Sequence, residues 1–447
     1  MSGAKRLRGS PARRPLTLSV TVALTVAAAG RAVRARAACM ILATPDAIDP
    51  AMTPASSDVL IIGGGIAGAS LACWLAPHLR VTVLERESQP GYHATGRSAA
   101  LYMPSYGSPQ VRALTRASGA FLAQPPAGFC DTALLSPRGA LRVASPGQQT
   151  QLDAHWALLQ APALAAPDQA RRLSRADACA MVPVLRPDLV IGALFEADAL
   201  DIDVHALHQG YLRALRRAGG TLVCNAGVTA ISRSGADWQV QAGGMGGSVG
   251  DGEGRTYRAP LLVNAAGAWV DEVARLAGVA PIGIEPRRRS ALLFAPPAGL
   301  DCRHWPMVIG ADEDWYLKPE AGQLLGSPAN ADPVVPQDVQ PEALDIALAI
   351  DRIERQTTLR IPRPSHTWAG LRSFVADGNL VGGFDPVAPG FFWLAAQGGY
   401  GIQTSAAMGA GCAALLRGLP LPEHLQAAGL TPAMLSPQRL RPAGEVA

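Results

Sequence analysis

The chain has 447 residues, of which 49% are hydrophobic and 17% are charged, and its formal net charge is +4. This length exceeds one typical hydrophobic core, so a two-lobed α/β protein is expected. The first 36 residues are rich in Arg and Lys and hold no acid, whereas the remainder is near neutral to acidic. Nothing in this balance indicates a nucleic-acid partner. The seven cysteines form no CxxC or metal-like cluster, which favours reduced thiols and no metal site.

The N-terminal segment allows two interpretations. An apolar run over residues 16–29 follows Arg13 and Arg14 and is too short to span a bilayer. It could be the apolar part of a twin-arginine signal. Alternatively, residues 1–57 could be a disordered extension, or the sequence could include an upstream start, because Met52 stands six residues before the first predicted strand. We favour the extension or upstream start and expect a cytoplasmic protein, at most peripheral to the inner membrane, without an integral membrane segment.

The most informative pattern lies where the extension ends. A short apolar β-run leads into a GxGxxG spacing formed by Gly63, Gly65 and Gly68. A helix is predicted over 69–79, and a second β-run over 81–84 ends in Glu85. Glycines at this turn let the backbone approach a pyrophosphate, the helix N-terminus faces it, and an acid about 20 residues later can bind a ribose hydroxyl. The pattern predicts a dinucleotide cofactor.

The middle of the chain alternates between helices, strands and loops. Helices are predicted at 109–122, 148–160, 168–180 and 203–217. Strands are predicted at 141–144 and 221–224, a glycine-rich hairpin loop at 242–254, and a disordered tail after Pro437. His205 and His208 share a face of the fourth helix, which we interpret as a solvated face because no third metal ligand is evident.

Two later segments point to FAD rather than NAD. Residues 261–269 form a buried strand that runs into small residues, against which the adenosine half of a flavin could pack. Residues 391–404 form a strand, a glycine-rich turn and the start of a helix, whose free amides can face the negative charge of a reduced flavin. An NAD fold has one early fingerprint and no such C-terminal cradle.

Several long motifs resemble the bacterial D-arginine dehydrogenases, a family within the D-amino acid oxidase/glycine oxidase group of flavoproteins. The resemblance covers about residues 58–440. The motifs that carry it are 91–100 (GYHATGRSAA), Ser290 after three arginines, 315–319 (WYLKP), 326–332 (GSPANAD) and 368–377 (WAGLRSFVAD). The family relation implies non-covalent FAD, hydride transfer from Cα of a D-amino acid to flavin N5, and hydrolysis of the imino acid to a 2-oxo acid and ammonia.

The same resemblance implies roles for individual residues. Arg289, Arg372 and Tyr316 would bind the substrate carboxylate, Tyr106 would supply a second hydroxyl, and the Gly399 carbonyl would meet the amine. A larger set would contact the cofactor: Gly63, Gly65, Ile66, Ala67, Gly68, Glu85, Arg86, Arg97, Ser98, Ala99, Val228, Gly267, Gly370, Gly398, Gly399, Tyr400, Gly401, Ile402, Gln403 and Thr404. His93 could attach a flavin covalently, but we expect a packing role.

The chain departs from the family where the substrate side chain would lie. Leu101 stands where the family has a histidine, Met103 adds an apolar wall, and Ala140 stands where the family has the carboxylate that binds guanidinium. A buried cation without an acid costs several kcal/mol. Apolar or uncharged D-amino acids are therefore expected to be better substrates than D-arginine, unless Asp312, Glu313 or Asp314 supplies the missing acid.

The expected fold is a doubly wound, Rossmann-like FAD-binding domain of the glutathione-reductase type with a second α+β substrate domain. The FAD-binding domain is predicted from 58–130, 200–285 and 377–447, and the substrate domain from 131–199 and 286–376. Two other functions stay open: a secondary-amine oxidase or dehydrogenase acting on sarcosine, glycine or an imino acid, and a catalytically silent FAD-binding protein. The electron acceptor, whether oxygen, a quinone or another carrier, and the oligomeric state cannot be read from the motifs.

Overall fold

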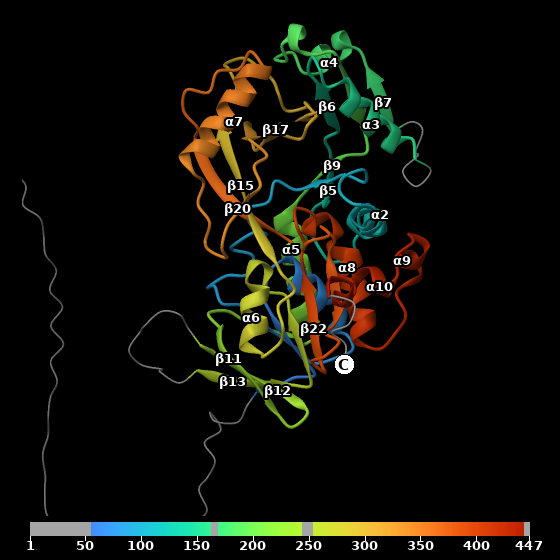
Figure 1. The fold of residues 1–447 in the computed structure, drawn as a ribbon, viewed down its shortest axis with the longest axis vertical. Coiled ribbons are helices and arrows are strands. Elements are labelled where there is room, and N and C mark those ends of the chain that lie inside the picture. Colours follow the sequence, from blue (N-terminus) through green and yellow to red (C-terminus); the bar gives the residue numbers. More distant parts are fainter. Residues whose placement is uncertain (1–54, 162–168, 244–253, 442–447) are drawn as a thin grey trace, which may run out of the picture. The chain divides into compact units, whose positions relative to one another are not determined.

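The computed structural model describes residues 55–161, 169–243 and 254–441, which belong to one unit, Met52–Ala447 (Figure 1). A six-stranded sheet carries the N-terminal glycine motif, and all its strand pairs are parallel except the last. Its strands, in spatial order, are β10 (Thr221–Val223), β3 (Val81–Leu84), β2 (Val59–Ile62), β14 (Leu261–Asn264), β22 (Phe391–Ala395) and β21 (Val381–Phe384). Strands β2, β3 and β22 are continuous apolar runs and are fully buried, as expected of a sheet covered on both faces.

Different elements cover the two faces of this sheet. Apolar side chains from one face pack with the helices α1 (Ile66–Leu75), α2 (Pro109–Ala123) and α8 (Gly401–Leu416). The opposite face packs against α6 (Val270–Leu276) and three antiparallel strands: β11 (Gly227–Ser234), β12 (Asp237–Gly243) and β13 (Arg255–Ala259). The two-residue strand β1 (Ala55–Ser56) pairs with β13. This arrangement confirms the predicted α/β class with a Rossmann-like cofactor fold.

A second, nine-stranded sheet contains both parallel and antiparallel strand pairs. Its path is β19 (Asp332–Pro333), β15 (Glu285–Phe294), β18 (Gln323–Ser327), β17 (Tyr316–Glu320), β16 (Met307–Gly310), β6 (Ala140–Ala144), β8 (Gly192–Glu196) and β7 (Ala170–Leu173), with β20 (His366–Phe374) also paired to β15. Helices α3 (Gln149–Leu159), α4 (Arg175–Met181) and α7 (Ala343–Gln356) pack against it. Its apolar core is separate from that of the six-stranded sheet.

Two features join the sheets. A small three-stranded sheet is formed by β4 (Leu101–Tyr102), β9 (Leu200–Ile202) and β5 (Leu135–Pro137). The long pair β15–β20 runs in unbroken register, and Ser373 near its end forms an isolated bridge with Gly398, just before α8. Residues of β20 are thereby held beside the start of α8.

The remaining helices of the described residues are short or amphipathic. Helix α5 (Val204–Arg217) begins at its cap Asp203, whose carboxylate accepts a hydrogen bond from the Ala206 amide. Short helices follow α8 or connect strands: α9 (Glu423–Ala427), α10 (Pro432–Leu435), η2 (Pro187–Leu189), η3 (Gly267–Trp269) and η4 (Pro437–Leu440). Within the described part of the chain, none of the helices has the length and apolar character needed to cross a membrane.

The structure corrects two predicted segments. The helix expected over 168–180 divides into strand β7 and helix α4, because Ser174 starts α4 with a capping box and the preceding residues pair with β8. The tail expected to be disordered from Pro437 instead continues as η4, and Arg441 forms an ion pair with buried Asp385. The predicted hairpin is present as the antiparallel pair β12–β13, while residues 244–253 of its loop lie outside the described residues.

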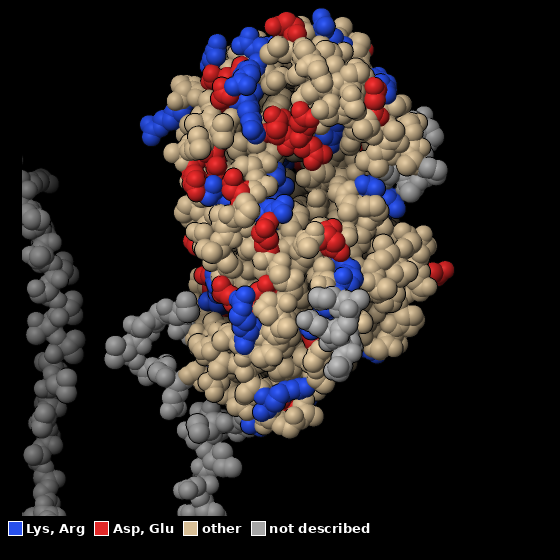
Figure 2. All heavy atoms as spheres, viewed as in Figure 1, with Lys and Arg blue, Asp and Glu red and all other residues tan. Residues whose placement is uncertain are grey.

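On the face of the molecule drawn in Figure 2, basic and acidic side chains are interspersed among uncharged ones. That face carries no broad basic surface of the kind that a nucleic acid requires. The described residues also contain no group of three or more His, Cys, Asp or Glu arranged to hold a metal ion.

Candidate active site

A first cavity surrounds the N-terminal glycine turn. Gly63 has φ +107°, a backbone conformation that favours glycine, and a Cβ there would collide with the Ala265 carbonyl. A Cβ on Gly68 would likewise collide with the Gly63 carbonyl, so this glycine allows α1 to pack tightly on β2. The Glu85 carboxylate lines the cavity and accepts hydrogen bonds from the amides of Gly64 (2.8 Å) and Glu87 (2.9 Å). The backbone of the glycine turn is therefore not covered by side chains where it lines the first cavity.

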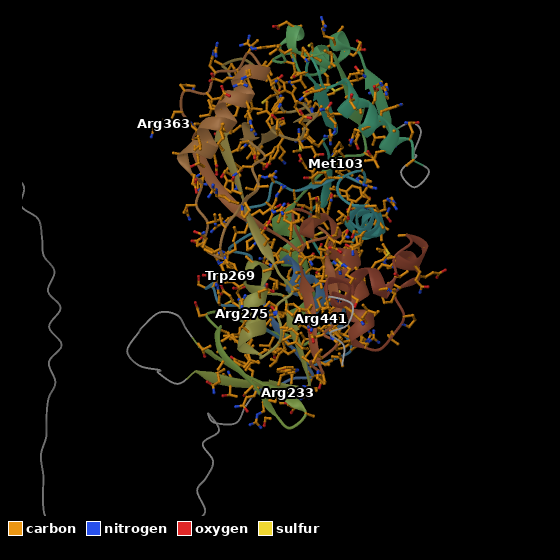
Figure 3. The ribbon with its side chains drawn as sticks, viewed as in Figure 1. Met103, Arg233, Trp269, Arg275, Arg363 and Arg441 are labelled. Carbon is orange, nitrogen blue, oxygen red and sulfur yellow. The ribbon has the colours of Figure 1, made fainter. Side chains whose placement is uncertain are left out.

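A second cavity adjoins the first. The two share lining residues at the start of α1 and in the turn before α8, among them Ile66, Gln397 and Gly398. Gly398 has φ +54°, and α8 begins three residues later, so its free N-terminal amides lie at the junction. Figure 3 labels one lining residue of each cavity, Trp269 for the first and Met103 for the second.

Two partly buried arginines line the second cavity. Arg289 extends from β15 and Arg372 from the neighbouring strand β20, and both line the cavity. Burial lowers the pKa of Arg289, and the like charge of Arg372 lowers it further. Burial opposes the charged form of Arg372 as well, but interactions with the hydroxyls of Tyr106 and Tyr316 outweigh it and raise its pKa. Both guanidinium groups are thus cationic at neutral pH.

The surroundings of these cations are short of negative charge. Among the described residues, neither Arg289 nor Arg372 forms an ion pair with a carboxylate, although Arg289 Nε donates to the Asn330 carbonyl (2.5 Å). Tyr106 and Tyr316 also line the cavity, and both raise the pKa of the two arginines. Because partly desolvated cations without a counter-ion are costly, this constellation is suited to bind an anion such as a carboxylate.

The fifth predicted catalytic position, Gly399, lines the same cavity. A Cβ at this glycine would lie 3.0 Å from the Arg372 guanidinium carbon. The structure therefore brings all five predicted catalytic residues, from five different segments of the chain, around one space. Their roles toward a substrate stay a prediction.

The predicted side-chain pocket is only partly as expected. Leu101 and Met103 line the second cavity, but Ala140 does not. Ala140 is 1% exposed and packs with Met103, Ile309 and Tyr316 behind the cavity wall. Two residues farther along β6, Arg142 lines the cavity and pairs with Glu313 at 3.0 Å. The pocket is thus less apolar than its sequence suggested.

The sequence profile of the family described as FAD dependent oxidoreductase (DAO) matches residues 58–415. The chain belongs to this family. Its sequence is 24% identical over 438 residues to the FAD-dependent oxidoreductase domain-containing protein 1 of Bos taurus, covering 86% of this chain and 85% of the bovine protein.

Solved structures of similar fold support the same assignment. Glycine oxidase from Geobacillus kaustophilus has a TM-score of 0.68 and 21% identity, over 82% of this chain and 95% of the other. The L-proline dehydrogenase from P. horikoshii has a TM-score of 0.68 and 19% identity, over 87% and 98% of the two chains. At these identities the likeness describes the fold of this oxidoreductase, not its substrate.

The residues present fit the FAD that this family uses. Of the residues predicted to contact the cofactor, those that line the first cavity are Gly63, Gly65, Ile66, Ala67, Glu85, Arg86, Val228, Gly267 and Gly398. Those that line the second cavity are Ile66, Arg97, Ser98, Ala99, Gly370, Gly398, Gly399, Gly401, Ile402 and Gln403. Two adjoining cavities, one bounded by a glycine turn with an acid and one by a helix N-terminus, match a molecule with a nucleotide half and a flavin half.

Three residues predicted to contact the cofactor line neither cavity. Gly68 acts through close packing, Thr404 donates its hydroxyl to the Tyr400 carbonyl (2.9 Å), and Tyr400 stacks edge-on against Tyr106 with ring centroids 5.3 Å apart. Burial raises the pKa of Tyr400 to about 12, so it stays a neutral phenol. The guanidinium of Arg97 forms an ion pair with Asp338 and hydrogen bonds with the carbonyls of Val339 and Ala369.

His208 corrects the expectation of a solvated helix face. It is buried, and its Nε2 lies 2.8 Å from the Gly64 carbonyl, inside the glycine turn. Burial lowers its pKa, which favours the neutral ring that donates one hydrogen bond to this carbonyl. Sequence periodicity placed His205 and His208 on one face of the helix. It could not show that α5 packs with His208 directed at the glycine turn.

Arg142 and Glu313 are the site residues that sequence reasoning missed or left open. Arg142 interrupts the apolar run of β6, Ala-Leu-Arg-Val-Ala, in which every residue is buried. A charged residue inside a buried strand is unusual and could have marked this position. Glu313 was one of three acids considered, and it alone of the three lines the cavity.

Proposed function

We propose that this protein catalyses the FAD-dependent oxidation of a D-amino acid to the imino acid, which water converts to a 2-oxo acid and ammonia. The observation that carries the proposal is the pair of partly buried arginines, Arg289 and Arg372, neither of which pairs with a carboxylate of the described residues, in a cavity that adjoins the glycine turn. Bound FAD would supply the redox chemistry by accepting the hydride from Cα. The protein's contribution is to hold the substrate and to exclude water.

Each cavity residue has a defined task in this proposal. Arg289 and Arg372 bind the substrate carboxylate, and the neutral hydroxyls of Tyr106 and Tyr316 donate to it. The Gly399 carbonyl accepts a hydrogen bond from the amine, so the amino acid is fixed at both ends of its Cα. A fixed orientation of the substrate lowers the entropic part of the barrier.

The side-chain end of the cavity argues against D-arginine, the substrate of the family that the motifs resemble. A guanidinium entering there would meet the like charge of Arg142, and the nearest lining acid, Glu313, is already paired with it. The walls also contain Leu101, Met103 and Ile309. We therefore propose that apolar or uncharged D-amino acids are oxidised faster than D-arginine.

A secondary-amine substrate is the second candidate. The fold is shared with an L-proline dehydrogenase and a glycine oxidase. Proline has a carboxylate next to a secondary amine, whereas glycine has it next to a primary amine. The carboxylate clamp would serve them equally well, so the choice rests on the amine side of the cavity.

We also propose that FAD is bound without a covalent bond and that the protein is cytoplasmic. His93, the residue considered for covalent attachment, lines the cavity of the glycine turn rather than that of the two arginines, and its Nε2 is within 2.8 Å of the Glu87 carboxylate. Heat or acid should therefore release the whole of the FAD. The electron acceptor is oxygen, a quinone or another carrier.

The deciding experiment is anaerobic mixing of the FAD-loaded protein with single amino compounds. Bleaching of the flavin absorbance by D-methionine or D-leucine, with slower bleaching by D-arginine, is the expected result. Faster bleaching by sarcosine or proline would replace the first candidate with the second. Protein that takes up FAD but is bleached by none of these compounds would contradict both, and re-oxidation by air would identify the acceptor class.

A further inference from the structure

Arg142 is a buried cation whose hydrogen-bonding capacity is mostly unused. Its side chain is 3% exposed, and the described residues offer it one carboxylate, that of Glu313. Its Nε is buried without a hydrogen-bond partner among these residues. A guanidinium has five N–H donors, and an unsatisfied buried donor costs free energy.

The Glu313 pairing does not account for the position of Arg142. Glu313 lies in the turn between β16 and β17, at φ +55°, and its side chain is 48% exposed. A pair that served only to stabilise the fold would gain little from an acid that is half in water, while the buried cation keeps its desolvation cost. The charged groups that line this cavity are four arginines and this single acid. One of the four, Arg97, is already paired with Asp338. The net charge of the other lining residues is therefore positive, which favours an anionic ligand.

The strand register places Arg142 in line with the carboxylate clamp. On the nine-stranded sheet, Tyr316 of β17 stands opposite Ile309 of β16, and Ile309 stands opposite Arg142 of β6. All three residues line the cavity. Neighbouring strands lie about 4.8 Å apart, so Tyr316 and Arg142 are separated by roughly 10 Å along this row. Arg289 lines the same cavity and interacts with Tyr316, which raises the Arg289 pKa, at the near end, and apolar Ile309 lies between the two ends.

We propose that the preferred substrate is an amino acid with a second carboxylate, which Arg142 binds. This inference rests on the proposed function and specifies its substrate class. The amino-acid carboxylate lies at Arg289 and Arg372, the methylene groups cover Ile309, and the distal carboxylate takes the free donors of Arg142. The separation along the row fits D-glutamate or D-2-aminoadipate better than the shorter D-aspartate. Acidic D-amino acids should be oxidised fastest, uncharged ones next and D-arginine slowest.

The kinetic test compares D-glutamate with D-glutamine, which has the same length and shape but no distal charge. With the FAD-loaded protein, kcat/KM for D-glutamate should exceed that for D-glutamine by about tenfold or more, because charge-assisted bonds in a dry site are strong. Arg142→Met should abolish or invert this ratio, while Arg142→Lys should keep part of it. Glu313→Gln should raise the ratio by removing the competing carboxylate. Arg303→Gln, at an exposed pair with Asp301, is the control variant and should leave the ratio unchanged.

A binding measurement separates this inference from the proposed function. Glutarate and pentanoate differ by one carboxylate, and their dissociation constants can be measured from the change in flavin absorbance without turnover. Glutarate should bind about tenfold more tightly, and Arg142→Met should remove the difference. Bleaching by D-glutamine but no preference for D-glutamate or glutarate would overturn this inference and leave the proposed function intact. Bleaching by no amino acid, with tighter glutarate binding retained, would overturn the proposed function while the anion subsite stands.

Discussion

The two adjoining cavities differ in which parts of their residues carry the contacts expected with a ligand. The cavity around the glycine turn is formed largely by backbone and small side chains, and its key positions are ones where a Cβ would strike a carbonyl. The cavity of the two arginines shares part of that lining, but its charged groups Arg142, Arg289 and Arg372 are long side chains from strands of a separate sheet. A cavity lined by backbone can bind one constant ligand, but its specificity changes only through substitutions that distort the fold. A side-chain surface can acquire a new ligand through single substitutions that leave the fold intact.

The largest expected effect is on the backbone-built cavity. Gly68→Ala places a methyl group against the Gly63 carbonyl, so α1 must move away from β2 and distort the turn. We expect loss of nearly all bound FAD, measured as flavin absorbance per protein after purification. Gly192→Ala is the matched control, because its Cβ would meet its nearest neighbour at an ordinary 3.5 Å. Full FAD content in the Gly68 variant would show that the turn tolerates rearrangement.

The second effect concerns the side-chain-built cavity. Arg289→Met removes one of the two cations of the carboxylate clamp and should lower kcat/KM on the order of 100-fold or more, because a charge-assisted pair with the substrate is lost. FAD content should remain that of the unmodified protein, since the substitution leaves the glycine turn alone. Steady-state kinetics with the best D-amino acid and the flavin absorbance measure both parts. Near-normal kcat/KM would place the carboxylate elsewhere.

A smaller effect tests how readily side chains change specificity. Because Ala140 stands where the related dehydrogenases have the carboxylate that binds guanidinium, the sequence alone would favour Ala140→Glu as a way to restore D-arginine oxidation. The structure places position 140 behind the cavity wall and two residues from Arg142 on the same face of β6, so a new glutamate would pair with Arg142. We expect little gain from Ala140→Glu alone, and a several-fold gain in D-arginine kcat/KM when it is combined with Arg142→Met. A full gain in the single variant would mean that Arg142 does not face the substrate.

The smallest effect is a pH dependence of stability in the glycine turn. Burial lowers the pKa of His208 below its ordinary 6.5, so the unfolded chain binds the proton more readily than the folded one. The contribution to stability is complete above the unfolded pKa and is lost as the pH falls from there toward the folded pKa. The Tm of the FAD-loaded protein, measured from about pH 8 to about pH 5, should decrease less steeply for His208→Gln than for the unmodified protein. Parallel curves would assign the acid sensitivity to other groups.

The backbone-built cavity was the more predictable of the two. The spacing of Gly63, Gly65 and Gly68 between a strand and a helix is local in sequence, and local geometry alone determines that turn. The dinucleotide interpretation followed from it, and the segments 261–269 and 391–404 then favoured FAD. The same local logic failed at 168–180, where pairing with β8 outweighed the helical pattern.

The side-chain-built cavity depends on registers that no local pattern contains. Arg142 faces the cavity because β6 pairs in parallel with β16, a strand more than 160 residues later in the chain. Its position next to Ala140 was visible in the sequence, but the alignment with Ile309 and Tyr316 was not. The direction of His208 was hidden for the same reason, since it depends on how α5 packs against the glycine turn.

At one point of the second cavity, a functional side chain depends on the absence of a side chain: Arg372 packs against the backbone of Gly399. A side chain at position 399 would press against the guanidinium carbon and nitrogens of Arg372, all 3.0 to 3.1 Å from its Cβ. Neither residue can therefore be exchanged freely while the other is kept. Over evolutionary time the two positions should covary among relatives of this chain: lineages that retain arginine at 372 should retain glycine at 399, and lineages that acquire a larger residue at 399 should have given up this arginine and, with it, the carboxylate clamp.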